Sequence, residues 1–233
     1  MKKFLFVLCA VLLVLSLTAF VACKEQEPTA EKQGLESRVS TYHDAVYVGE
    51  NEDFAVSFVT GEAEKLIVID GEVGEIAPFA TLTVTPQTSE LFNNTYTYLM
   101  KGENGEKSGS LVKDVIGASF SAEVEGAKEI GKILAVSVVA EGILESEVTL
   151  ANKLEGALDW KEVLAVAEKE LADVITAESD TGNLQREIYV KLVNALAAQD
   201  APYYYYVSFI KSPSDYWALL VDPMTGEVIS KKV

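Results

Sequence analysis

The most constraining feature of the chain is a repeated alternation of apolar and polar residues between about residues 42 and 150. In the run from Phe54 to Phe58, period two places both aromatic side chains and Val56 on one face of a strand. Similar runs follow at residues 65–69, 81–84, 95–99, 119–124 and 133–139. Turn residues separate them, including Asn104-Gly105, a pair that favours a tight hairpin. The series predicts an antiparallel, immunoglobulin-like β-sandwich over residues 41–152.

The pattern changes to a helical period at Leu158. Asp159 is a helix-capping residue, and Glu162 follows three positions later, as a capping box requires. The apolar residues then recur at helical spacing: Trp160, Val163, Leu164, Ala167, Leu171, Val174 and Ile175. We therefore expect an amphipathic helix whose apolar stripe is covered by another element.

Strand-like segments follow this helix. Residues 203–210, 216–221 and 227–233 are rich in aromatic or β-branched residues, and we expect each to form a strand. Residues 187–193 also favour a strand, although Ile188, Leu192 and Leu196 fit helical spacing as well. Residues 153–233 are thus predicted to form a helix on a small antiparallel sheet, which gives a β plus α+β chain.

The end of the chain resembles a PepSY domain. The resemblance covers about residues 159–233 and depends on the order of helix and strands and on the segment from Asp222 to Glu227, with its Thr225-Gly226 pair. Turn chemistry alone accounts for part of this segment, because Asp222 can cap a turn and Gly226 accepts positive φ. The resemblance implies an extracytoplasmic module that binds or restrains peptidases and carries no fixed catalytic residue.

The first 23 residues have the layout of an export signal. Lys2 and Lys3 precede an apolar run from Phe4 to Ala22. The stretch from Phe20 to Cys23 resembles the lipobox of bacterial lipoproteins. This resemblance implies a signal peptide at residues 1–22, fatty acylation of Cys23 and a flexible tether at residues 23–40. The protein would then be anchored through lipid to the extracytoplasmic face of a bacterial membrane. The alternative is a retained membrane helix over residues 4–22.

Charge excludes one class of partner. The chain has a formal net charge of −17, and removal of residues 1–22, which hold two lysines and no acidic residue, makes it −19. Nucleic-acid binding needs a concentrated basic face, so nucleic acid is excluded as a partner. Basic proteins and divalent cations fit the charge, but an acidic surface also serves solubility alone.

Catalytic and cofactor motifs are missing from the sequence. His43 is the only histidine, which leaves no catalytic triad and no site with several histidine ligands, and we expect it to be a surface residue. Cys9 lies in the leader and Cys23 is the proposed anchor, so no thiol remains for catalysis or disulfides. The acidic segments 50–53 and 70–72 lack the EF-hand pattern and are expected to be solvated turns. We predict no catalytic residue, no metal site and no cofactor.

Four consecutive tyrosines stand out in the predicted sheet. As a strand, residues 203–206 send Tyr204 and Tyr206 to the face opposite Tyr205. We expect the pair Tyr204 and Tyr206, joined by an aromatic of the next strand such as Tyr216 or Trp217, to lie on a face that one helix does not cover. Tyr204, Tyr206 and Trp217 are therefore the predicted partner-binding residues. The alternative is that these tyrosines pack on the sandwich or only favour the strand.

These observations lead to three hypotheses for function. The first is a lipid-anchored protein that binds a cell-wall component or another surface protein and has no catalytic activity. The second is a regulator or inhibitor of a secreted peptidase, as the PepSY resemblance implies. The third is a carboxylate-dependent glycan hydrolase, which needs two facing acids in a cleft.

Overall fold

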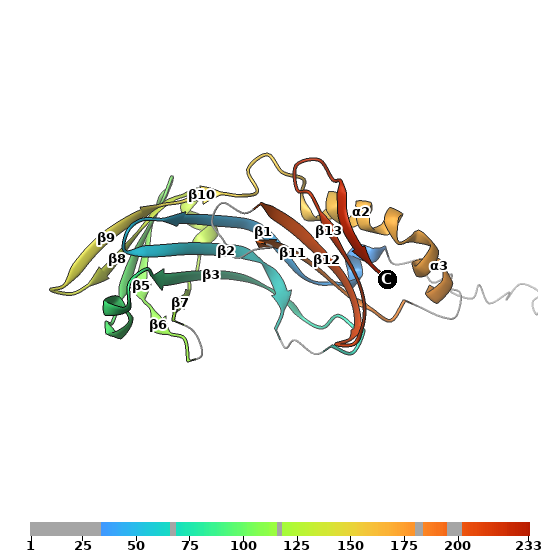
Figure 1. The fold of residues 1–233 in the computed structure, drawn as a ribbon, viewed down its shortest axis with the longest axis horizontal. Coiled ribbons are helices and arrows are strands. Elements are labelled where there is room, and N and C mark those ends of the chain that lie inside the picture. Colours follow the sequence, from blue (N-terminus) through green and yellow to red (C-terminus); the bar gives the residue numbers. More distant parts are fainter. Residues whose placement is uncertain (1–33, 66–68, 116–117, 180–183, 195–201) are drawn as a thin grey trace, which may run out of the picture. The chain divides into compact units, whose positions relative to one another are not determined.

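The structure is a computed structural model that describes residues 34–65, 69–115, 118–179, 184–194 and 202–233 (Figure 1). The predicted signal peptide 1–22, Cys23 and most of the predicted tether lie outside these residues, as does most of the strand predicted at 65–69. Within the described ranges, no helix combines the length and the apolar character needed to cross a membrane. The helix η1 (Leu35–Arg38) and the first residues of β1 (Val39–Glu50) fall inside the predicted tether 23–40, so the folded part begins earlier than the sequence suggests.

Most of the strands belong to one large sheet with the order β14-β13-β12-β11-β1-β2-β3-β7-β6, and β10 also pairs with β1. Two further short helices of the 3-10 type, η2 (Ser89–Asn93) and η3 (Ala127–Ile130), lie in connections. The strands of this sheet are β1 (Val39–Glu50), β2 (Phe54–Glu64), β3 (Ile76–Pro86), β6 (Val112–Lys113), β7 (Phe120–Glu123), β10 (Ala151–Asn152), β11 (Glu187–Asn194), β12 (Tyr203–Ser212), β13 (Asp215–Val221) and β14 (Val228–Lys232).

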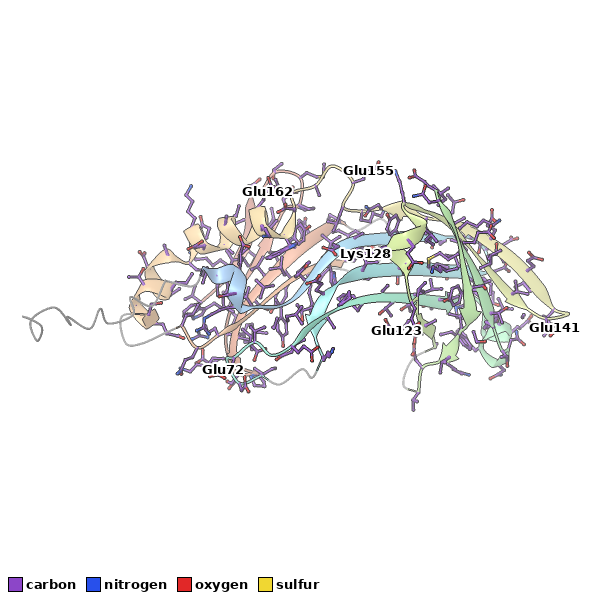
Figure 2. The ribbon with its side chains drawn as sticks, turned by 180° about the vertical axis from the view of Figure 1, so that it is seen from behind. Glu72, Glu123, Lys128, Glu141, Glu155 and Glu162 are labelled. Carbon is purple, nitrogen blue, oxygen red and sulfur yellow. The ribbon has the colours of Figure 1, made fainter. Side chains whose placement is uncertain are left out.

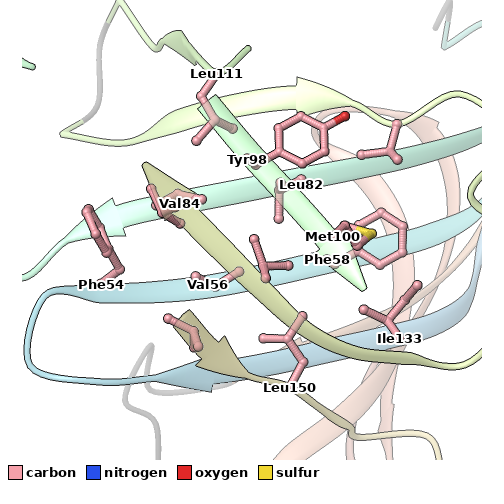
Figure 3. Close-up of a cluster of buried hydrophobic side chains, with 14 of the residues drawn as sticks. Phe54, Val56, Phe58, Leu82, Val84, Tyr98, Met100, Leu111, Ile133 and Leu150 are labelled. Carbon is pink, nitrogen blue, oxygen red and sulfur yellow. The ribbon is translucent and has the colours of Figure 1, made fainter. Parts of the chain in front are cut away.

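A second, four-stranded antiparallel sheet has the order β5-β4-β8-β9. Its strands are β4 (Thr97–Gly102), β5 (Gly105–Ser110), β8 (Ile133–Ala140) and β9 (Leu144–Thr149). Its apolar side chains share one core with β1, β2, β3 and β7 of the large sheet (Figure 3). Phe54, Phe58 and Met100 are among the fully buried side chains there, as the alternation at residues 54–58 predicts. The two-layer β arrangement is thus present.

The β4–β5 hairpin forms where the sequence predicts it. Gly102 pairs with Gly105, so the two residues of the turn are Glu103 and Asn104 rather than Asn104 and Gly105. The difference is one position, because Gly105 already takes part in the ladder.

Two helices, α2 (Trp160–Glu170) and α3 (Ala172–Ser179), replace the single predicted helix. The predicted capping box is confirmed: Lys161 and Glu162 donate their backbone N–H groups to Asp159 Oδ1 at 2.9 Å, and the Asp159 N–H donates to Glu162 Oε2 at 2.9 Å. The backbone departs from helical geometry at Leu171, with φ −104° and ψ 10°. Leu171 nevertheless remains buried, so the break leaves the apolar stripe in place.

A second core lies between α2 and strands β11, β12 and β13 (Figure 1). Val163, Leu164 and Ala167 of α2 are buried in it. Trp160, at the start of α2, stacks on Tyr42 of β1, with 4.3 Å between the ring centroids. Strands β11 to β14 pair antiparallel with their sequence neighbours, so the predicted helix on an antiparallel sheet is present.

The large sheet crosses the boundary expected near residue 152, because β1 pairs in parallel with β11. The segments 41–152 and 153–233 therefore share one sheet. This parallel pairing extends from Val39 to Tyr42, after which β10 pairs with β1 at Tyr47 and Val48. A β-bulge lies between the two paired stretches of β1, where the register shifts between His43 and Ala45.

His43 is not the surface residue that the sequence suggests. It lies within β1, and its Nδ1 atom accepts a hydrogen bond of 3.1 Å from the Leu192 N–H of β11. Burial, followed by repulsion from Lys191, lowers the pKa of His43 to about 4. The imidazole is therefore neutral at pH 7 and serves as an acceptor where the β1–β11 ladder ends.

Candidate functional site

Alternation gives strands β11, β12 and β13 two different faces. On the first face, each strand contributes three buried apolar side chains to the core beneath α2. Tyr205 belongs to this face: it is 1% exposed, and its hydroxyl donates to the Leu158 carbonyl at 3.0 Å. We call this side the covered face: Ile188, Val190, Leu192, Tyr205, Val207, Phe209, Trp217, Leu219 and Val221.

Trp217 lies on the covered face, which corrects the expectation that it accompanies Tyr204 and Tyr206. It pairs in register with Phe209, and cross-strand partners point to the same side of a sheet. The Arg186 guanidinium lies 3.8 Å from the Trp217 ring centroid and forms ion pairs with Glu178 and Asp215. Trp217 is only 9% exposed, so this indole is not available to a partner.

Tyr204 and Tyr206 lie on the opposite side of the same strands, as the alternation predicts. In register, Tyr206 is opposite Lys191 on β11 and Leu220 on β13. Tyr189 and Tyr216 share this side, because they pair with Ser208 and Ile210 respectively. We call the surface formed by these four tyrosines with Lys191 and Lys232 the tyrosine face.

The tyrosine face reaches solvent. Its four tyrosines are each partly exposed, and none belongs to either hydrophobic core. Ser208 and Ala218, which alternate with them, are buried, so the small residues form the floor and the phenol rings form the surface. Burial raises the pKa of Tyr206, and the neighbouring Tyr216 raises it further, so the Tyr206 phenol is a neutral donor at pH 7.

Two lysines place positive charge on this face. The Lys232 ammonium lies 3.3 Å from the Tyr216 ring centroid, and the Lys191 ammonium lies 4.6 Å from the Tyr189 ring centroid. Both are cation–π contacts. Within the part of the chain that the structure describes, neither lysine forms an ion pair. Burial lowers the pKa of Lys191 from its ordinary value.

Glu187, next to the tyrosine face, is fully buried, and both of its carboxylate oxygens accept hydrogen bonds from other groups of the protein. Its Oε1 atom accepts the backbone N–H groups of Asp70 at 2.9 Å and Gly71 at 3.2 Å. Its Oε2 atom accepts the hydroxyls of Ser40 at 3.3 Å and Tyr189 at 3.5 Å. The segment 70–72, expected as a solvated acidic turn, is therefore held at its backbone by Glu187, which also positions Tyr189.

The rest of the described surface carries much of the negative charge. Exposed glutamates on separate segments point outward in Figure 2, among them Glu72, Glu123, Glu141, Glu155 and Glu162. No group of three or more histidine, cysteine or acidic side chains in the described ranges is arranged to hold a metal ion. The chemistry that the tyrosine face offers is aromatic stacking, phenol hydrogen bonds and two ammonium charges.

The sequence pointed to Tyr204 and Tyr206 but missed Tyr189, Lys191 and Lys232. The alternation of β11, which can be read from the sequence, puts Tyr189 and Lys191 on one side of the strand. The register between strands cannot be read from the sequence, and only this pairing shows that Lys191 lies opposite Tyr206.

Comparisons with known proteins add no relative. No family model, no curated protein and no solved structure matches the chain.

Proposed function

We propose that the protein is a lipid-anchored, extracytoplasmic binding protein without catalytic activity, and that the tyrosine face contacts its partner at the cell envelope. The observation that carries this proposal is the gathering of Tyr189, Tyr204, Tyr206 and Tyr216 on one face of β11, β12 and β13, where none of the four belongs to either core. Solvent-accessible tyrosines combine apolar contact area with a hydroxyl donor, and they are enriched in recognition surfaces.

The test is binding of the full-length protein to isolated envelopes from its own bacterium. Replacing Tyr206 and Tyr216 by serine removes two rings of the face, and we expect envelope binding to fall at least tenfold. Val112→Ser is the matched control, since Val112 is an apolar side chain, 69% exposed, on β6 at the other end of the large sheet. Equal binding by the wild type and the tyrosine double variant would end the proposal.

The anchor is tested separately. Metabolic labelling with a fatty acid should mark the wild-type protein and fail on the Cys23→Ala variant. Continued labelling of that variant would show that the lipid is attached elsewhere or that residues 4–22 are retained as a membrane segment.

Regulation of a peptidase is the second candidate. It is favoured by the order of α2 and four antiparallel strands, which is consistent with a PepSY-like module, and by the turn at Asp222. Asp222 Oδ1 accepts the backbone N–H groups of Met224 and Thr225 at 2.9 Å. A direct inhibition assay with secreted peptidases of the same bacterium tests this role, and no change in their rates would exclude those peptidases as targets.

A further inference from the structure

We propose that the partner of the tyrosine face is a polysaccharide that carries carboxylate groups. This inference depends on the proposed binding function and names the chemistry of the ligand. Two features carry it. Aromatic rings stand on a floor of small residues, and two lysines on the same surface form no ion pair with any residue that the structure describes.

The charge of the face is opposite to that of the chain. The chain as a whole has a formal net charge of −17, yet Lys191 and Lys232 both lie on the side of the sheet that holds the four tyrosines. The nearest carboxylate along β11, Glu187, is fully buried and accepts four internal hydrogen bonds. Glu64 also acts electrostatically on Tyr189. The positive charge of the face therefore lies at Lys191 and Lys232, and an anion is favoured there.

The cations of the face favour a glycan over a protein. Protein interfaces are enriched in aromatic residues, tyrosine among them, and in methionine and arginine, but they are depleted in lysine. Here the cations are lysines, while Arg186 and Trp217 are buried against each other on the covered face. The C–H face of a pyranose ring can stack on a phenol ring, and sugar hydroxyls can bond with the phenol hydroxyls.

The backbone hydrogen bonding of the strands also favours a glycan over an extended peptide. An extended peptide binds a sheet through the free backbone groups of an edge strand. The four tyrosines and Lys191 lie on β11, β12 and β13, each of which pairs on both sides, so this part of the tyrosine face offers side chains only; Lys232 alone lies on the edge strand β14. A sugar chain needs no backbone partner.

The spacing of the cations suits a polymer with separated charges. Lys191 and Lys232 lie on β11 and β14, three strand spacings apart, which is about 14 Å across the sheet. Tyr206 and Tyr216 lie on the strands between them. A chain with one carboxylate per sugar can place its charges near both lysines while the intervening sugars contact the phenol rings.

The test measures binding of the full-length protein to three probes of similar size: polygalacturonate, dextran and poly-L-glutamate. We expect polygalacturonate to bind at least tenfold more tightly than either of the others. Lys232→Gln and Lys191→Gln should each weaken polygalacturonate binding by about tenfold, while Lys169→Gln should leave it unchanged. Lys169 is the matched control, because it is exposed on α2 and its replacement changes the net charge equally. Far-ultraviolet circular dichroism checks that each variant is folded.

Each other outcome contradicts the proposal in its own way. Equal binding of dextran would mean that charge plays no part. Equal or tighter binding of poly-L-glutamate would mean that the ligand is an acidic polypeptide. Envelope binding that depends on Tyr206 and Tyr216, with no affinity for polygalacturonate, would refute the ligand class and leave the binding function standing. Loss of the tyrosine dependence itself would refute both.

Discussion

The covered face and the tyrosine face of β11, β12 and β13 share one backbone but differ in what their side chains do. On the covered face, Val207 and Phe209 are fully buried beneath α2. On the tyrosine face, Tyr204 and Tyr206 alternate with these two residues and remain partly exposed. A run of aromatic residues in a strand can therefore serve two purposes, because period two sends half of it to the core and half to the surface.

The largest effect should come from the covered face. Replacing Phe209 by alanine removes a fully buried ring beside Trp217 and leaves a cavity, so we expect the free energy of unfolding to fall by about 3–5 kcal/mol. Urea unfolding followed by circular dichroism measures it. A loss below about 1 kcal/mol would mean that the core beneath α2 is not packed as described.

A pH-dependent effect should appear at His43, where β1 and β11 separate. Its pKa is about 4 in the folded protein against 6.5 for an ordinary histidine, so the unfolded chain binds the additional proton between these values. Stability from this group is therefore present above pH 6.5 and lost as the pH falls towards 4, by about 2–3 kcal/mol.

The His43→Asn variant isolates this contribution, because an amide oxygen can still accept the Leu192 N–H but does not titrate. We expect its stability to depend less on pH between 6.5 and 4 than that of the wild type, in parallel urea titrations. Identical slopes would show that the pKa of His43 is not lowered in the folded state.

A smaller loss of stability should follow from a change at the N-terminus of α2, the helix that packs on the covered face. Asp159→Ala removes the acceptor for two backbone N–H groups of α2, and we expect a loss of about 1 kcal/mol in thermal or urea unfolding. Asp173→Ala, an exposed position of α3, is the comparison and should change stability little. If both variants were equally stable, the capping box would not contribute to the fold.

A substitution on the tyrosine face should have the smallest effect on stability. Tyr206→Ser removes a partly exposed ring that belongs to neither core, so we expect a loss of no more than about 1 kcal/mol. The same urea titration used for Phe209→Ala measures it. A loss comparable to that of Phe209→Ala would contradict the division between the two faces.

Most helices and strands could be predicted from the sequence, because the patterns that specify them lie within a few consecutive residues. The capping box at Asp159, the alternation at residues 54–58 and the strand from Tyr203 were each visible in sequence. The pairing of β1 with β11 was not, since it joins Tyr42 to Val190 and leaves no local signal. The same limit explains His43 and Trp217. His43 accepts a hydrogen bond from Leu192 and Trp217 lies against Arg186, and both contacts join residues far apart or on different strands.

Photo-crosslinking in living cells, with a benzophenone amino acid placed at one position at a time, shows directly which face contacts a partner. At Tyr206 it should attach the protein to an envelope component, and at Glu141, exposed in the β8–β9 turn (Figure 2), it should not. Equal yields at the two positions, or a product only at Glu141, would contradict the assignment of the tyrosine face as the binding surface.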